Sequence, residues 1–112
     1  PRRVLLTGDI QRAAMLSVLE QTAEPHGVRA HILEMPHHGS HHAAGERFLA
    51  EVAPVAVLQS TGPSRLGDER WGGSVRAVLG RGGAWNITAR DGAVFAEILD
   101  DGRVRSGAGL AE

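Results

Sequence analysis

Metal-capable side chains follow two apolar segments of the chain, each at the point where the segment ends. Asp9 comes after the run at residues 4–7, and His37 and His38 come after the segment that ends at Met35. Carboxylate and imidazole groups suit a borderline divalent cation such as Zn²⁺ or Mn²⁺. Four histidines lie within residues 37–42, and such a density favours a metal role because imidazole is the commonest metal ligand.

The same residue types also have ordinary structural interpretations. Asp9 stands where the N-cap of a following helix belongs, and capping is compatible with ligation because a carboxylate has two oxygens. Loop histidines are commonly solvated, and we expect His41 and His42 to be exposed at the start of a helix. His26, in a turn, and His31, in a strand, are interpreted as structural.

The elements around these residues predict an α/β fold. Short apolar runs predict buried strands, and apolar residues three to four apart predict amphipathic helices. The expected order is β-α-β-α-β-α followed by strands, with strands at 4–7, 30–35 and 55–58, helices at 10–22, 42–52 and 74–79, and strands at 85–87, 93–99 and 103–105. Because sites in open α/β sheets lie at the carboxyl ends of the strands, adjacent first and second strands would bring Asp9 beside His37 and His38.

Local patterns give finer predictions. The first helix is expected to bury the face that carries Ile10, Ala14, Val18 and Leu19, and the second helix the face that carries Ala44, Phe48, Leu49 and Val52. Ser74 is expected to cap the third helix. The dipeptides Asp91-Gly92 and Asp101-Gly102 are typical of hairpin turns.

Composition limits the possible classes of protein. The 112 residues form one domain at most, and 42% hydrophobic with 22% charged residues is a globular composition. The chain has no Cys, which excludes disulfides, thiolate zinc sites and cysteine nucleophiles. Its net charge of −1 argues against tight, purely electrostatic binding of nucleic acid. No apolar run approaches the ~20 residues that span a bilayer.

Further candidate groups follow the third expected strand. Arg65 and Arg70 could contact a phosphate, since guanidinium matches phosphate geometry, although solvated loop charge is the ordinary interpretation. For Trp71 and Trp85, packing in the core or against a loop is favoured over stacking on a base. Ser40 lacks the pattern of a hydrolytic nucleophile.

Two motifs together resemble a known family. Residues 4–10, Val-Leu-Leu-Thr-Gly-Asp-Ile, and residues 33–40, Leu-Glu-Met-Pro-His-His-Gly-Ser, resemble the second half of a metallo-β-lactamase-fold domain. More narrowly, they resemble the domain of ComEC-type competence proteins, the membrane channels for DNA uptake in transformation. Residues 48–49, 54–57 and 89–93 fit the same family in order and spacing. The resemblance implies half of an αββα sandwich, with residues 1–105 as the C-terminal part of the domain and 106–112 as a frayed tail.

The resemblance also implies site residues and a reaction. Asp9 matches a carboxylate that bridges two metal ions, and His38 is favoured as the final histidine ligand. His37 is then a catalytic neighbour that faces the phosphate or handles a proton; the sequence itself does not order the two histidines. Arg65 and Arg70, chosen for their residue type and loop position, would bind substrate. The implied reaction is phosphodiester hydrolysis with two Zn²⁺ or Mn²⁺ ions, on the DNA strand that is not taken up.

The family's main ligand run, His-x-His-x-Asp-His, is absent from these residues, so we expect the chain to be part of a larger protein. The implied partners are the missing N-terminal half of the domain, single-stranded DNA and the membrane channel of the same parent. The parent is expected in the bacterial inner membrane, with this part soluble and binding metal weakly or not at all by itself. Two alternatives stay open: another metallo-β-lactamase-fold hydrolase of small esters or phosphodiesters, and a catalytically silent structural or DNA-guiding module.

Overall fold

The fold is built on a four-stranded parallel sheet. The computed structural model describes residues 2–8, 12–21, 28–61 and 69–108. The strands lie in the order β1-β2-β3-β4, with the bounds Val4–Leu5, Ile32–Glu34, Ala56–Gln59 and Ala84–Ile87. Val4 pairs with Ile32, Ile32 with Ala56 and Ala56 with Ala84. The loops that follow these strands therefore meet at one edge of the sheet.

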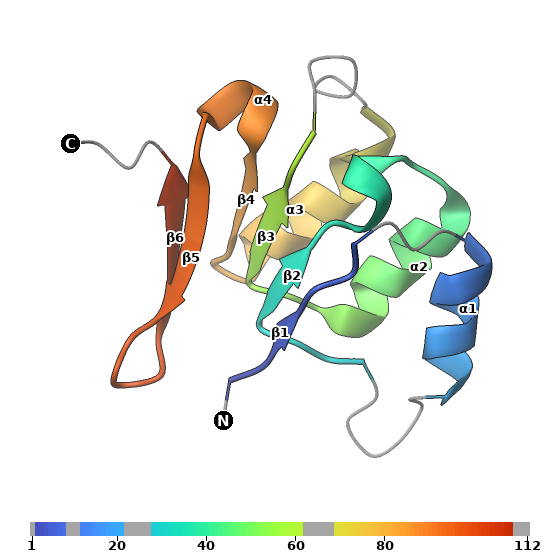
Figure 1. Ribbon diagram of the computed structural model, residues 1–112, viewed down its shortest axis with the longest axis horizontal. Coiled ribbons are helices and arrows are strands. Elements are labelled where there is room, and N and C mark those ends of the chain that lie inside the picture. Colours follow the sequence, from blue (N-terminus) through green and yellow to red (C-terminus); the bar gives the residue numbers. More distant parts are fainter. Residues whose placement is uncertain (1, 9–11, 22–27, 62–68, 109–112) are drawn as a thin grey trace.

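Helices cover one face of this sheet and a hairpin covers part of the other (Figure 1). The helices α1 (Arg12–Gln21), α2 (Ala43–Val52) and α3 (Gly72–Gly80) connect consecutive strands. Because crossovers between parallel strands keep one hand, strands in sequential order receive all their helices on one face. On the opposite face, β5 (Val94–Ile98) and β6 (Val104–Ala108) pair antiparallel and pack against β3 and β4.

The apolar core lies between the helices and the parallel sheet. Leu33 and Val57 from the strands are fully buried, in one cluster with Met15 of α1 and Phe48 of α2. The predicted apolar face of α2 is confirmed, since its buried side chains recur three to four residues apart. In α1 the prediction is confirmed for Leu19, which is buried together with Met15, and for Val18, which packs against the core. It is wrong for Ala14, which is exposed, and Ile10 lies outside the described residues.

The predicted α/β fold and its element order are confirmed. The three long helices lie within two residues of their predicted bounds, and the first two strands are neighbours and parallel. The turn at Asp101-Gly102 also joins β5 to β6 as expected, with Gly102 at φ 89°. Within the described ranges, no helix is long and apolar enough to cross a membrane.

The Asp91-Gly92 hairpin prediction is wrong. Residues 84–87 join the parallel sheet beside β3, and the chain then forms the short helix α4 (Thr88–Asp91). The Asp91 carboxylate accepts from the Ile87 amide at 2.9 Å, which closes this turn locally and leaves Gly92 to change the chain direction at φ 79°. Two distinct sheets therefore replace the expected hairpin.

Two further boundary predictions need correction. Ser74 does not cap α3, because that helix begins at Gly72 and continues directly from the 3₁₀ turn η3 (Glu69–Trp71). Residues 106–108 are not part of a frayed tail, since they belong to β6 and pair with the first half of β5. Gly107 suits this pairing because a Cβ there would lie 3.3 Å from the Phe95 ring. Residues 109–112 lie outside the described part of the chain.

Candidate functional site

The loops after β1 and β2 are joined at the carboxyl edge of the sheet. Glu34, the last residue of β2, accepts through Oε1 from the amides of Thr7 and Gly8, each at 2.9 Å. The Thr7 hydroxyl donates in turn to the Glu34 carbonyl at 2.7 Å. These three hydrogen bonds fix the residues that lead directly into Asp9. Asp9 itself lies outside the described residues.

His38 has a side chain arranged as metal-binding histidines commonly are. It lies in the 3₁₀ turn η1 (Pro36–Gly39) and is exposed, and its Nδ1 lies 2.9 Å from the Ser60 carbonyl oxygen. A carbonyl can only accept, so Nδ1 carries the hydrogen and the lone pair of the neutral ring is on Nε2. Histidine ligands are usually oriented in this way by a backbone carbonyl on the second nitrogen. In this tautomer Nε2 is the ring atom whose lone pair could bind a metal.

The backbone of His38 is strained. Its φ is 53°, in the left-handed region that non-glycine residues rarely adopt. Such conformations cost of order 1–3 kcal/mol and persist where the surroundings impose them, often at functional sites. The conformation therefore indicates that the position of this ring is enforced by its surroundings.

The surroundings that enforce it are centred on Gly39. Gly39 has φ 84°, and the buried Trp71 Nε1 donates to its carbonyl at 2.7 Å. A Cβ at Gly39 would lie 2.2 Å from Nε2 of Gln59, a side chain that is 2% exposed. Gln59 is itself held, because its Oε1 accepts from Trp85 Nε1 at 2.8 Å. The packing interpretation of both tryptophans is thereby confirmed.

The next two histidines have structural partners. His42 is the N-cap of α2, where its Nδ1 accepts from the Gly45 amide at 3.1 Å. His41 packs edge-on against Trp71 with the ring centroids 4.7 Å apart, and it is paired with Glu46. Both side chains are half-buried, so the expectation of exposed rings is wrong. The hydrogen bond between His42 and the Gly45 amide and the contact between His41 and Trp71 account for this partial burial.

The predicted site residues thus fall into two groups. His38 and Arg70 belong to the described part of the chain, and both are exposed. His38 contacts the Ser60 carbonyl, and Arg70 lies on η3 next to the Trp71 that is hydrogen-bonded to the histidine loop. Arg65 lies outside the described residues, as does the His37 side chain, although the His37 backbone belongs to η1. His26, interpreted as structural, also lies outside them. Among the residues that the structure describes, no three His, Cys, Asp or Glu side chains form a group that could hold a metal ion.

Sequence reasoning missed the residues that position the site. Glu34 and Gln59 each end a strand, but their partners come from a neighbouring strand or its following loop. Only the register of the strands brings those partners together, and no local sequence pattern predicts that register. Their sequence position, polar residues at the carboxyl ends of buried strands, is the one feature that could have drawn attention to them.

No family model, no curated protein and no solved structure matches this chain.

Proposed function

We propose that this chain is the C-terminal part of a metallo-β-lactamase-like hydrolase domain and contributes Asp9 and His38 to a divalent-metal phosphodiesterase site. The observation that carries the proposal is the His38 ring. Its tautomer is set by Ser60, its backbone is held at φ 53°, and it lies at the edge where Glu34 anchors the loop leading to Asp9. A ligand atom fixed in this way does not need to be ordered when a metal binds.

The donor chemistry of these residues fits Zn²⁺ or Mn²⁺. Such ions, when bound, would stabilise charge on the phosphate oxygens and lower the pKa of water. His38 would offer Nε2 as a ligand, and the Asp9 carboxylate would offer two oxygens. Ser60 orients the His38 ring and Glu34 positions the turn before Asp9. In the proposal His37 handles a proton or faces the phosphate, while Arg65 and Arg70 attract the anionic substrate.

The remaining ligands would come from a segment outside these residues. An open apolar sheet face supports a further protein layer, because Val4 and Leu6 of the β1 segment are 49% and 75% exposed while Leu5 between them packs against the core. Sheets bury both faces in layered α/β folds. The missing N-terminal half of the domain is the proposed covering layer. The proposed parent is a ComEC-type DNA-uptake channel of the bacterial inner membrane.

A small-molecule substrate is the second candidate. The net charge of −1 gives no broad field for nucleic acid, which favours a small phosphodiester or ester over single-stranded DNA. The two substrates are distinguished by the rates of the complete domain on a single-stranded oligonucleotide and on a small phosphodiester. In that domain Asp9→Ala is expected to abolish metal-dependent hydrolysis of either.

Calorimetric titration of the metal-stripped 112-residue chain tests the half-site directly. We expect weak binding of Zn²⁺ or Mn²⁺, because Asp9 with one or two histidines gives fewer ligands than two ions require. His38→Ala should reduce this binding, whereas His42→Asn, which keeps a side chain able to cap α2, should leave it unchanged. Tight binding of two ions would show a complete site in this chain, and unchanged binding in His38→Ala would remove His38 from the ligand set.

A further inference from the structure

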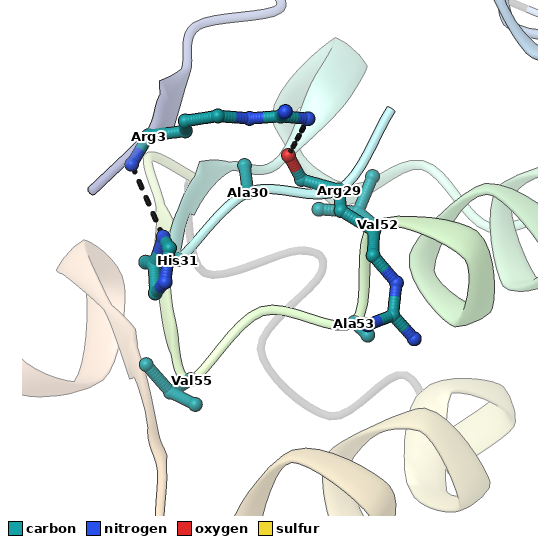
Figure 2. A pocket seen from close by; sticks show the side chains of 7 residues that line it. All are labelled: Arg3, Arg29, Ala30, His31, Val52, Ala53 and Val55. Atoms are coloured by element: carbon teal, nitrogen blue, oxygen red, sulfur yellow. Dashed lines mark hydrogen bonds between the residues drawn. The ribbon is translucent and has the colours of Figure 1, made fainter. Parts of the chain in front are cut away.

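A hollow lies at the edge of the sheet opposite the histidine loop. It has a volume of about 360 Å³ and is lined by residues that precede the first three strands and by the end of α2. Arg3 comes before β1, His31 before β2 and Val55 before β3 (Figure 2). This is the amino edge of the parallel sheet, so the hollow is separate from the histidine loop. Its volume falls in the range of small-molecule sites.

His31 lines this hollow with a ring held in one tautomer. The Arg3 amide donates to His31 Nδ1 at 3.1 Å, so the lone pair of the neutral ring is on Nδ1 and the hydrogen is on Nε2. The His31 carbonyl accepts from the amides of Val55 and Ala56, which fixes the backbone that carries the ring. His31 is therefore structural, as predicted, and its ring, which carries the hydrogen on Nε2, is part of the lining.

Two arginines give the hollow a positive charge. The Arg3 guanidinium extends across it and donates to the Arg29 carbonyl, while the Arg29 side chain runs along the hollow towards Ala53 (Figure 2). Burial and the nearby Arg2 lower the pKa of His31, as expected where the potential is positive. Of the described residues that line the hollow, none is acidic.

The rest of the lining is apolar. Val52, Ala53 and Val55 form this part of the wall. The carbonyl oxygens at the C-terminal end of α2 carry partial negative charge, which would repel an anion. Two of them are already hydrogen-bonded, since the Leu49 carbonyl accepts from the Ala53 amide and the Val52 carbonyl accepts from the Ala30 amide. The hollow therefore combines two guanidinium groups and the His31 ring with an apolar surface.

We propose that this hollow binds a phosphate monoester carried on an apolar or aromatic body, the chemistry of a nucleoside monophosphate. Two arginines with a permanent positive charge, and no acidic residue in the described lining, favour an anion, and guanidinium donors fit phosphate oxygens. The apolar wall accounts for a body attached to the phosphate, because inorganic phosphate alone would leave it uncovered. The proposal is independent of the metal site, since the two lie at opposite ends of the strands.

Titrations of the full chain followed by amide NMR test this proposal, with adenosine monophosphate, adenosine and inorganic phosphate as probes. We expect the monophosphate to bind at least about tenfold more tightly than either part alone, with shifts centred on Ala30, His31 and Val55. Arg29→Met keeps the aliphatic stem and should weaken this binding about tenfold, the equivalent of ~1.4 kcal/mol. The matched control is Arg47→Met, which removes an exposed arginine of α2 that does not line the hollow and should change nothing.

Three results would overturn the proposal. Equal affinities for adenosine and its monophosphate would show that the charge is not recognised. Equal binding by Arg29→Met and the unsubstituted chain would remove the arginine from the site. Shifts confined to the histidine loop, or no binding at millimolar monophosphate, would show that the hollow takes no such ligand.

Discussion

A single methyl group at Gly39 should disturb the loop that carries His38. Gly39→Ala places a Cβ at 2.2 Å from Gln59 Nε2 and 2.7 Å from its Cδ, in a residue held at φ 84°. Gln59 cannot simply move aside, because it is 2% exposed and bonded to Trp85. The left-handed conformation costs roughly 1–2 kcal/mol for an L-residue. Overpacking adds typically 1–3 kcal/mol, so we expect a loss of about 2–5 kcal/mol.

Gly82→Ala is the matched control. Gly82 has a similar φ of 79°, but a Cβ there meets nothing within 4 Å, so only the conformational cost remains, roughly 1–2 kcal/mol. Urea unfolding at equilibrium measures both variants, and the difference between them isolates the clash with Gln59. In Gly39→Ala/Gln59→Ala the two costs should be less than additive by about 1 kcal/mol or more. Equal losses in Gly39→Ala and Gly82→Ala would refute the reasoning that Gln59 clamps the loop.

Three further substitutions test other contacts of the fold and the site. Glu34→Ala should speed hydrogen exchange of the Gly8 amide and lower the free energy of unfolding by about 1–3 kcal/mol, whereas Glu34→Gln keeps an acceptor and should lower it less. Equal exchange in the two variants and the unsubstituted chain would contradict the bond between Glu34 and Gly8. Trp71→Phe should cost about 1–3 kcal/mol in urea unfolding because it orphans a buried carbonyl, and an unchanged midpoint would contradict this. The Arg90 guanidinium beside Asp91 holds the pKa of that carboxyl well below its usual range, so its stabilising contribution is present above about pH 4 and is lost as the pH falls towards the folded-state pKa. Asp91→Ala should therefore cost about 1 kcal/mol in thermal unfolding at pH 7 and progressively less below pH ~4, and a cost independent of pH would contradict the ion pair.

The parts of the fold that follow from hydrophobic periodicity were predictable. The face of α2 and the buried strands β2 and β3 are encoded in residues close together in the sequence. The prediction that the first strand is also buried is wrong, because Val4 is 49% exposed at the edge of the sheet. The short helix α4 was missed because Asp91-Gly92 is equally compatible with a turn, and the choice depends on the Asp91 bond to Ile87 and on β4 joining β3. In α1 the exposed Ala14 shows that a small apolar residue does not fix which face is buried.

The site was predictable only in part, for a related reason. His38 was identified from residue type and density, while its tautomer depends on Ser60, which lies 22 positions along the chain. The contact of Glu34 with Thr7 likewise depends on the register that pairs Leu5 with Leu33. Contacts set by strand register are not visible in local sequence patterns.

Imidazole ¹⁵N NMR of His38, before and during addition of Zn²⁺, tests the central claim most directly. We predict that the neutral ring carries its hydrogen on Nδ1, because the Ser60 carbonyl can only accept. On addition of Zn²⁺, the His38 Nε2 signal should shift before those of the other histidines. A His38 ring protonated on Nε2, or a titration that shifts His41 and His42 while His38 stays unchanged, would contradict the assignment of His38 as a metal ligand.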